Sequence, residues 1–259
     1  MFQIIKSYLN FLWSSKNEHG VHSPFVFNLV TKCFYDTTKY YEYSILKEYR
    51  NSLLANKNTI EVSDFGAGSR VFKSNIRAVS QIAKTAGISS KRAKLLFRIV
   101  NYFQPKNLLE IGTSLGLATS ALSLGTKKGK IITLEGCPNT LNECQLQLQK
   151  FNFNNVIAIN TEFSSYLKNY QLSIVNDHLI YFDGNHSQKA TLEYFELLLP
   201  TITNDSVWIF DDIHWNEAME DAWEIIKKHP KVTVTIDTFQ WGIIFFRREQ
   251  KKEHFVIRT

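Results

Sequence analysis

The spacing of apolar residues changes character near residue 88. Before that point apolar positions recur every three or four residues, which predicts amphipathic helices joined by loops. Ser23-Pro24 is a helix start, because a serine cap commonly precedes a proline at the first helical position. The apolar faces expected to pack onto a core are Phe2, Ile5, Leu9 and Leu12; Phe25, Val26, Leu29, Val30 and Cys33; and Leu46, Tyr49 and Leu53.

From Ser89 onward, short apolar runs alternate with helical stretches. A helix is expected from Ser89 to about Phe103, where Gln104-Pro105 ends it. The runs that read as strands are Leu108–Ile111, Lys130–Leu134, Val156–Ile159, Leu179–Phe182 and Val207–Phe210. The helical stretches between and after them are 116–124, 138–151, 187–199 and 215–228. Alternation at this spacing predicts an α/β fold with a parallel sheet and helices on both faces.

The end of the chain has a different pattern. Residues Lys231–Asp237 alternate with period two, and the apolar run Trp241–Phe246 follows after only three residues. Three residues cannot hold a parallel crossover, so this pair is predicted to be an antiparallel hairpin. We therefore expect a helical extension over residues 1–88, which would cap an active site, and an α/β core over 89–259.

Composition narrows the class of protein. The chain is 44% hydrophobic and 21% charged, which is ordinary for a globular protein. Cys33, Cys137 and Cys144 are too few and too scattered for a disulfide framework or a zinc site, so a reducing compartment, the cytoplasm, is expected. No apolar stretch is long enough to span a membrane, and Lys6 and Asn10 interrupt the run that would make a signal peptide.

The net charge of +6 is spread along the chain. Its densest clusters, Lys91–Lys94 and Arg247–Lys252, are interpreted as solvated surface with a positive bias. We therefore do not expect nucleic acid as a partner. The sequence leaves a homodimer open.

The segment Leu108–Gly116 ends a strand and opens a helix, with Gly112 at the turn. Doubly wound folds bind ligands at such carboxyl strand ends, and glycine lets a ligand approach the backbone. Glu135 closes the next strand, where an acid accepts hydrogen bonds from ribose hydroxyls; its alternative is a surface acid near a helix start. NAD is the competing ligand, but Ser114 stands where its fingerprint needs a second glycine. A cofactor without a pyrophosphate is favoured.

A second glycine-rich segment, Val62–Ser69, looks like a similar loop. No acid-ended strand follows it, and residues 74–103 read as two helices. It is predicted not to bind the cofactor, and it is either a loop that closes over the active site or a structural turn.

Four motifs carry a resemblance to a known family: Glu110–Gly116, Leu134–Gly136, Asp183–Ser187 and Phe210–Asp212. With them, residues 89–247 resemble the class I S-adenosylmethionine (SAM)-dependent methyltransferases, and among these the catechol- and caffeoyl-CoA-type O-methyltransferases. The segments His19–Phe25 and Asp64–Ser69 resemble those of uncharacterised methyltransferase-like proteins from Bacteroidetes-type bacteria. The resemblance implies a Rossmann-like, seven-stranded, mostly parallel sheet that ends in the antiparallel hairpin.

The resemblance also implies a cofactor site for SAM. Glu135 would hold the ribose and Glu162 would lie near the adenine. The cofactor-binding residues expected on this basis are Glu110, Gly112, Thr113, Ser114, Gly116, Glu135, Gly136, Glu162 and Asp183.

In the resembled enzymes an aspartate and an Asp-Asn pair at the ends of strands four and five bind a divalent cation. The matching residues here are Asp183 and Asp211-Asp212, so a site for Mg²⁺ or another divalent cation is predicted. Three converging carboxylates would otherwise repel one another. The alternative is that Asp211-Asp212 caps the following helix, where aspartates favour the dipole.

The resemblance further implies a general base. The animal catechol enzymes have a lysine three residues after the strand-four aspartate, and His186 has that position here. Histidine is suited to proton transfer near neutral pH, while its alternative is a polar residue near a helix start. His186 and Asp183 are thus the predicted catalytic residues. The aromatic residues Trp208, Trp215, Trp241 and Phe239 would wall an acceptor pocket or belong to the core.

The function expected from these residues is methyl transfer from SAM to a hydroxyl of a small molecule, assisted by a cation. The alternatives are a methyltransferase that acts on nucleic acid or protein, and a SAM-binding protein without catalysis. The sequence lacks the Asn/Asp-Pro-Pro-Tyr/Phe signature of amino-nitrogen DNA methylation and a dedicated basic arm. Intact Glu110, Gly112 and Glu135 argue against loss of the site.

Overall fold

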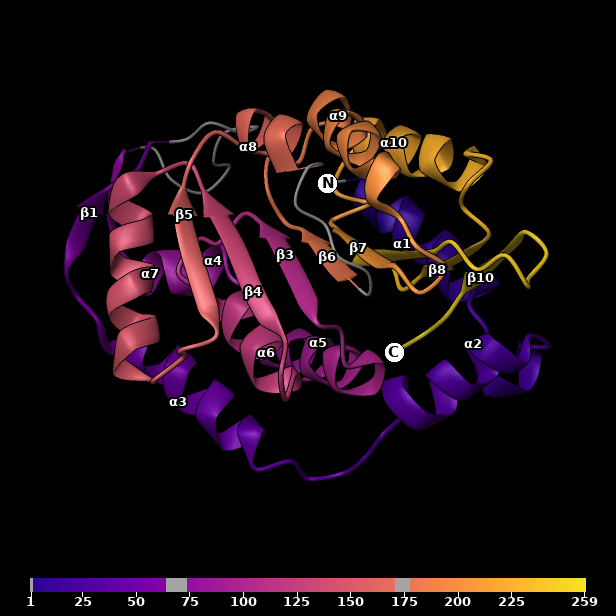
Figure 1. Cartoon of the computed structure of the whole chain (residues 1–259), viewed down its shortest axis with the longest axis horizontal. Helices are drawn as coiled ribbons and strands as arrows, with labels where there is room; N and C mark the ends of the chain where they lie inside the picture. Colours follow the sequence, from indigo (N-terminus) through magenta and orange to yellow (C-terminus); the bar gives the residue numbers. More distant parts are fainter. Residues whose placement is uncertain (1, 64–73, 171–177) are drawn as a thin grey trace.

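A computed structural model describes residues 2–63, 74–170 and 178–259 of the chain. An eight-stranded sheet lies between two layers of helices (Figure 1). The strands are β1 (Thr59–Glu61), β2 (Ile76–Ala78), β3 (Asn107–Ile111), β4 (Lys130–Glu135), β5 (Val156–Asn160), β6 (His178–Phe182), β7 (Val207–Asp211), β8 (Val234–Asp237), β9 (Trp241–Phe245) and β10 (Glu253–Val256). Strands β1 and β2 form a separate antiparallel pair.

The helices that follow β3, β4, β5, β6 and β7 are the crossovers of a doubly wound sheet. The α-helices are α1 (Phe2–Ser14), α2 (Pro24–Leu29), α3 (Glu42–Ala55), α4 (Val79–Thr85), α5 (Ser90–Phe103), α6 (Leu117–Gly125), α7 (Pro138–Lys150), α8 (Phe163–Tyr170), α9 (Gln188–Leu198) and α10 (Glu217–Lys228). Short 3₁₀ or π segments are η1 (Glu18–Gly20), η2 (Val30–Phe34) and η3 (Leu199–Thr201). The predicted alternation of strands and helices is confirmed.

The strand order in the large sheet is β10-β8-β9-β7-β6-β3-β4-β5. Strands β3 to β7 are mutually parallel, and β9 is antiparallel to both β7 and β8, which confirms the predicted hairpin. The expected number of seven strands was wrong by one, because β10 adds a further strand parallel to β8. Its sequence, Glu253–Val256, begins with two exposed polar residues and is too short to show an apolar run.

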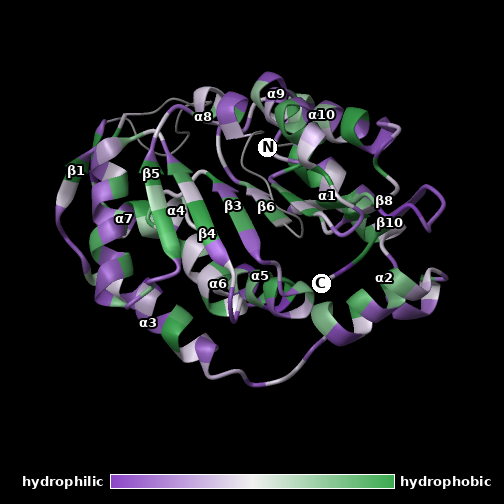
Figure 2. Cartoon of the chain, in the orientation of Figure 1, coloured by the Kyte–Doolittle hydropathy of each residue, from purple (hydrophilic) through white to green (hydrophobic). Residues whose placement is uncertain are grey.

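Successive strand residues point to opposite faces of the sheet and so build two cores. Leu108, Leu179 and Val207 belong to the core beneath α2 to α6, whereas their chain neighbours Leu109 and Ile180 belong to the core beneath α8 to α10. Figure 2 shows much of the strands in the middle of the sheet in the hydrophobic colour, with hydrophilic positions on β3 and β4. Burial on both faces explains why the sequence shows continuous apolar runs here rather than alternation.

The N-terminal helices share one of these cores. Leu46, Tyr49 and Leu53 of α3 are buried, as predicted, and the Tyr49 hydroxyl donates a 2.9 Å hydrogen bond to the carbonyl of Leu115 in the glycine-rich loop. Residues from both predicted parts therefore contribute to this core, and the helical extension contacts the glycine-rich loop through Tyr49. The division of the chain at residues 88 and 89 stays a prediction.

Helix α1 packs differently from the expectation. Ile5 and Leu9, predicted to face the core, are exposed by 53% and 59%. The opposite side faces inward instead: Phe11 is buried, and the rings of Tyr8 and Phe11 contact Phe239 with centroids 4.9 and 5.5 Å away. The apolar residues of α1 surround most of the helix, so periodicity alone did not decide which side is buried. Among the helices of the described residues, none is long and apolar enough to cross a membrane.

Candidate active site

The glycine-rich loop turns sharply where β3 ends. Gly112 has φ = 100°, and a β-carbon there would collide with the backbone of Asp183 at the end of β6. Ser114 is also left-handed, with φ = 49°, and Gly116 begins α6 with φ = 76°. The loop therefore holds its backbone N–H groups at the carboxyl edge of the sheet, as the sequence predicted.

Glu135 contacts this loop directly. Its carboxylate accepts hydrogen bonds from the backbone N–H of Ser114, at 2.8 Å, and of Cys137, at 2.9 Å. Gly136 follows, and its carbonyl accepts a 3.0 Å hydrogen bond from the side chain of Asn160, the last residue of β5. The acid at the end of β4 is thus fixed in orientation beside the turn.

Glu110 lies one layer deeper. It is fully buried, and its Oε2 accepts hydrogen bonds from Thr119 at 2.5 Å and Thr133 at 2.6 Å. Burial raises the pKa of Glu110 to about 8 in spite of these two bonds. Within the described residues its Oε1 has no hydrogen-bond partner. Thr113 joins the same group, with its hydroxyl 2.5 Å from that of Thr133.

Glu162 follows β5 at the same edge of the sheet. Its carboxylate accepts the backbone N–H groups of Ser164, at 3.0 Å, and Ser165, at 2.6 Å, at the start of α8. Burial opposes the charge, but these hydrogen bonds lower the pKa of Glu162. The residue therefore caps a helix, and its contact with adenine stays a prediction.

The predicted aspartates lie together at the ends of β6 and β7, around Arg92, which the prediction did not include. Asp211 is only 4% exposed and forms an ion pair with the guanidinium of Arg92 from α5. The hydroxyl of Tyr181 on β6 also donates to Asp211, at 3.3 Å. Burial opposes the charge of Arg92, and the carboxylates of Asp211, Asp183 and Asp212 are among the groups that raise its pKa.

The other two aspartates lie beside this pair. Burial, followed by the neighbouring Asp211 carboxylate, raises the pKa of Asp183 well above its ordinary range. Burial and Asp211 also raise the pKa of Asp212 to about 6. Asp212 is left-handed, with φ = 55°, and its N–H bonds to Asp211 Oδ1 at 2.9 Å and to the Gln240 carbonyl at 2.8 Å.

The structure corrects the helix-cap alternative for Asp211-Asp212. Helix α10 begins at Glu217, and its cap is Asn216, whose side chain accepts the N–H of Met219 at 2.9 Å. Asp211 and Asp212 lie at the end of β7, several residues earlier. The turn from β7 to α10 places Asn216, and not the aspartates, beside the unpaired N–H groups at the start of α10. Asp211 is instead the counter-ion of Arg92.

The structure does not support the predicted metal site at Asp183, Asp211 and Asp212. In residues 2–63, 74–170 and 178–259, no group of three His, Cys, Asp or Glu side chains is arranged to hold an ion. Arg92 supplies the positive charge instead. The sequence did contain a signal for it: the first turn of α5 has Lys91 and Arg92 and no acid, although the helix dipole disfavours cations there.

His186 lies beside Asp183, with Nε2 3.7 Å from Oδ1, and its side chain is 28% exposed. Helix α9 begins two residues later, and its cap is Ser187, whose hydroxyl accepts the N–H of Ala190 at 3.4 Å, so His186 also lies near a helix start, as its alternative required. His186 is therefore a partly exposed side chain next to the aspartate that ends β6.

A small cavity separates the glycine-rich loop from the N-terminal helices. Its lining includes Ala83, Gly87 and Ile88 around the α4–α5 connection, and Thr113 and Asp183 at the strand ends. The segment Asp64–Ser69, predicted to be a turn or an active-site loop, lies outside the described residues.

The four aromatic residues predicted to wall a pocket divide by location. Trp208 is fully buried in the core beneath α9 and α10. Trp241 is buried as well, yet its ring lies 5.1 Å from the Arg92 guanidinium carbon and so borders the carboxylates. Phe239 packs against α1, and Trp215 lies half-buried in the β7–α10 connection.

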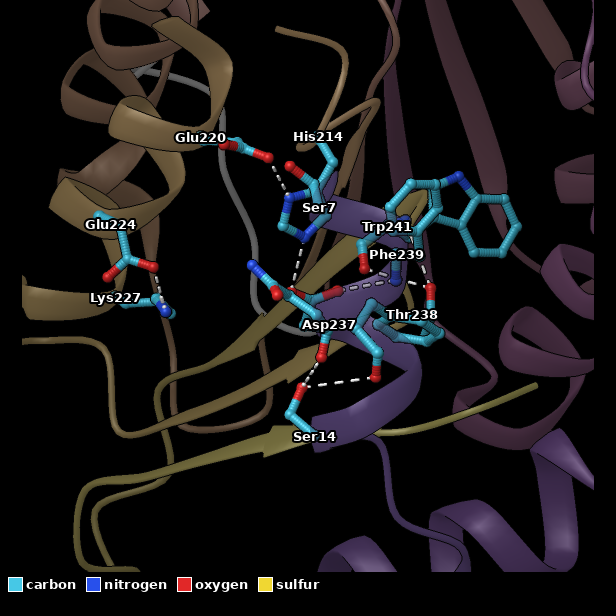
Figure 3. A network of polar contacts seen from close by, with 12 residues as sticks. Ser7, Ser14, His214, Glu220, Glu224, Lys227, Asp237, Thr238, Phe239 and Trp241 are labelled. Carbon is cyan, nitrogen blue, oxygen red and sulfur yellow. Dashed lines mark hydrogen bonds and ion pairs between the residues drawn. The ribbon is translucent and has the colours of Figure 1, made fainter. Parts of the chain in front are cut away.

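A second charged cluster follows the same strand. The His214 ring lies between two carboxylates, with Nδ1 2.9 Å from Glu220 and Nε2 2.8 Å from Asp237 (Figure 3). Burial would lower the pKa of His214, but Asp237 and then Glu220 raise it. Gln3 of α1 donates to Glu220 at 3.1 Å, so the cluster also contacts the N-terminal helix.

Comparison with known proteins agrees with this geometry. Residues 109–213 match a family described as a methyltransferase domain. No curated protein sequence matches the chain. A solved SAH-bound methyltransferase from Podospora anserina is similar in structure, with a TM-score of 0.59 and 14% identity over 88% of this chain and 97% of that one.

Two further solved structures are similar. An O-methyltransferase from Bacillus cereus in complex with SAH has a TM-score of 0.56 and 17% identity over 83% of this chain and 94% of that one. The O-methyltransferase TomG from Streptomyces achromogenes, involved in tomaymycin synthesis and solved with SAM, has a TM-score of 0.58 and 12% identity over 84% and 95%. Residues 109–213 therefore match a methyltransferase domain, and the chain has the fold of these solved methyltransferases, in agreement with the resemblance seen in the sequence.

Proposed function

We propose that this protein transfers a methyl group from SAM to a hydroxyl of a small molecule. The observation that carries the proposal is the loop from Gly112 to Gly116 with the Glu135 carboxylate beside it, at the carboxyl edge of a class I methyltransferase sheet. The similarity to solved O-methyltransferases from Bacillus cereus and Streptomyces achromogenes supports oxygen as the acceptor atom. A cytoplasmic location is part of the same proposal.

The residues at the loop fit SAM. Gly112 lets the loop turn tightly against the backbone of Asp183, where a β-carbon would collide, and Glu135 presents a fixed carboxylate suited to ribose hydroxyls. The buried Glu110 Oε1, without a partner among the described residues, is a polar atom left for a ligand or a water molecule. When bound, SAM supplies a methyl group on a positively charged sulfonium.

The protein contributes positioning and a proton acceptor. Holding two reactants in attack geometry supplies roughly 7–11 kcal/mol, so the loop and the ends of β6 and β7 account for much of the rate. The acceptor hydroxyl must also lose its proton. His186 takes that proton at Nε2, and the side chain of Asp183, with Oδ1 3.7 Å away, keeps the imidazole ring at the end of β6.

Calorimetry tests the cofactor. A hydrogen bond to a charged group is worth about 1.5–3 kcal/mol, so Glu135→Ala should weaken SAM binding by roughly tenfold or more. Glu196→Ala, an exposed position on α9, removes the same charge and should leave the affinity unchanged. Equal SAM affinity in wild type and Glu135→Ala, or tight binding of NAD by wild type, would contradict the proposal.

Turnover tests the base. With catechol and simple alcohols as trial acceptors, release of S-adenosylhomocysteine should fall about 10²–10⁴-fold in His186→Ala, because that is the usual contribution of a general base. The Kd for SAM should stay at the wild-type value. A His186→Ala protein with wild-type turnover would assign the proton transfer to another group.

A further inference from the structure

The three carboxylates at the ends of β6 and β7 already have a counter-charge. The Arg92 guanidinium, carried by the first turn of α5, pairs with Asp211 and lies 5.1 Å from the ring of Trp241. Its side chain is only 17% exposed. A buried carboxylate is costly without a partner, and an arginine remains protonated at every pH at which proteins fold. The charge at this point is therefore permanent and belongs to the chain.

The oxygens of Asp211 are committed to protein donors. Oδ1 accepts from Arg92 and from the Asp212 N–H, and Oδ2 accepts from the hydroxyl of Tyr181. A hard divalent ion such as Mg²⁺ demands oxygen ligands in near-octahedral geometry. Asp211 can offer an ion a ligand only if the guanidinium leaves, and the ion and Arg92 would repel each other. The donor set thus does not fit the divalent cation that the resemblance implied.

We propose that Arg92 takes the place of the divalent cation, so that the acceptor end of the site is organised by a guanidinium and works without metal. Arg92 is then a positioning residue, which pairs with Asp211 and holds the ends of β6 and β7 together beside Asp183. The role of Arg92 in methyl transfer rests on the proposed function. The exclusion of a divalent cation from the three carboxylates does not.

The test is a metal titration of the protein without SAM or acceptor, so its outcome is independent of whether the protein methylates anything. Calorimetry with Mn²⁺ and with Mg²⁺ should show no saturable binding to wild type. Arg92→Ala leaves the carboxylates uncompensated, and such a group recruits a cation. This variant should gain saturable one-site Mn²⁺ binding, at least tenfold tighter than any binding to wild type, and the gain should disappear in Arg92→Ala/Asp211→Asn.

Matched variants separate charge from position. Lys91→Ala removes a positive charge from the same helical turn but leaves Arg92 in place, and it should gain no metal binding. Arg92→Lys keeps a cation near Asp211 and should gain none or little. Saturable Mn²⁺ binding to wild type that Asp211→Asn abolishes would overturn the proposal, and so would a folded Arg92→Ala protein that gains no binding. The wild-type measurement decides the question even if Arg92→Ala does not fold.

In activity assays with a fixed acceptor, wild type should keep its full rate of S-adenosylhomocysteine release in excess EDTA. Loss of that rate in EDTA, restored by Mg²⁺, would likewise overturn the proposal. Failure of the proposed function has a different signature, which is the absence of SAM binding in the calorimetry described above.

Discussion

Two groups of carboxylates near the end of β7 are neutralised in different ways. In one, Asp211 pairs with Arg92, which reaches it from α5 on the other side of the sheet edge. In the other, His214 lies between Glu220 and Asp237. Arginine holds its charge at every relevant pH, whereas histidine is charged only below its pKa. The positive charge beside Asp211 should therefore stay constant near neutrality, whereas the positive charge between Glu220 and Asp237 should change with pH.

The two groups also connect different parts of the fold. Arg92 joins α5 to the strand ends that carry the proposed acceptor site, while the His214 group joins α10 and the β8–β9 hairpin to α1 through Gln3. The permanent cation, Arg92, lies at the strand ends of the proposed active site. The titratable one, His214, lies where α1 packs onto the sheet. The difference indicates that the identity of the counter-ion, more than the number of acids, decides how each region responds to its conditions.

The largest effect is expected for the permanent pair. Breaking a buried pair by removing one partner costs about 3–5 kcal/mol, so Arg92→Ala should lower the free energy of unfolding by this amount. The loss should be larger at pH 9 than at pH 6, because Arg92 lowers the pKa of the neighbouring Asp212, which burial and Asp211 raise to about 6, and this carboxylate is more fully charged at pH 9. Chemical denaturation at the two pH values measures it, with Lys91→Ala as the control. A loss that is smaller at pH 9 than at pH 6 would break the comparison.

Glu110 is a buried carboxylate with no cation among the described groups that shift its pKa, and it extends the comparison of the two charged groups. Glu110 is buried with its pKa raised to about 8, so the folded protein keeps it protonated while the unfolded chain ionises it above its ordinary pKa. Wild-type stability should then fall as pH rises from about 4.5 to 8, by about 1.4 kcal/mol per unit. Glu110→Gln lacks this term. Its stability relative to wild type should rise by roughly 2–3 kcal/mol between pH 6 and pH 9, as measured by urea unfolding.

Glu110→Asp would be an unsuitable control, since it retains the titration, and Glu143→Gln on the surface of α7 is better. Glu143→Gln should show no such trend. A flat difference between Glu110→Gln and wild type would mean that Glu110 is ionised in the folded protein.

The titratable cation should show the next effect. The folded state raises the pKa of His214, so the stabilisation is complete below the unfolded pKa of about 6.5 and is lost as pH rises through the higher folded value. His214→Gln should cost about 2 kcal/mol at pH 6, because the hydrogen bonds involve charged groups, and less at pH 9. Thermal unfolding at several pH values measures the narrowing gap. If the stability difference between wild type and His214→Gln instead grew with pH, His214 would not be stabilised in its charged form.

Much of the fold was predictable because its signals are local. Strands buried on both faces appear as apolar runs, and the three-residue link before Trp241 forces an antiparallel partner. Strand β10 was not predictable, since its pairing with β8 depends on a distant neighbour and not on its own pattern. The buried side of α1 was missed for a similar reason, because the contact of Phe11 with Phe239 is known only once the hairpin is placed.

The candidate site was predictable where it is built from strand ends. Gly112, Glu135, Asp183 and Asp211 all follow from the order of strands and their carboxyl edge. Arg92 was not, because it reaches Asp211 across 119 positions of sequence and appeared as one of several basic residues in a solvated cluster. A counter-ion brought by packing leaves no regular spacing in the sequence.

The smallest effect concerns how α5 presents Arg92. Ser89 caps this helix, and its hydroxyl accepts the backbone N–H of Arg92 itself at 3.3 Å. Ser89→Ala should cost about 1 kcal/mol of stability in chemical denaturation, the usual loss for a serine cap. The exposed neighbour Ser90→Ala should change stability by only a few tenths.

Ser89→Ala separates the backbone support of Arg92 from its charge. Other residues of α5 hold the helix in place, since Ala93, Leu96 and Phe97 are buried in the core, so the guanidinium should stay on Asp211 without the cap. The variant should therefore resemble wild type in the Mn²⁺ titration, and its loss of stability relative to wild type should be the same at pH 6 and pH 9. If it instead gained metal binding, as expected for Arg92→Ala, the cap would be what holds the cation at the carboxylates. The position of the guanidinium beside Asp211 would then depend on one hydroxyl at the start of a helix, and not on the packing of α5.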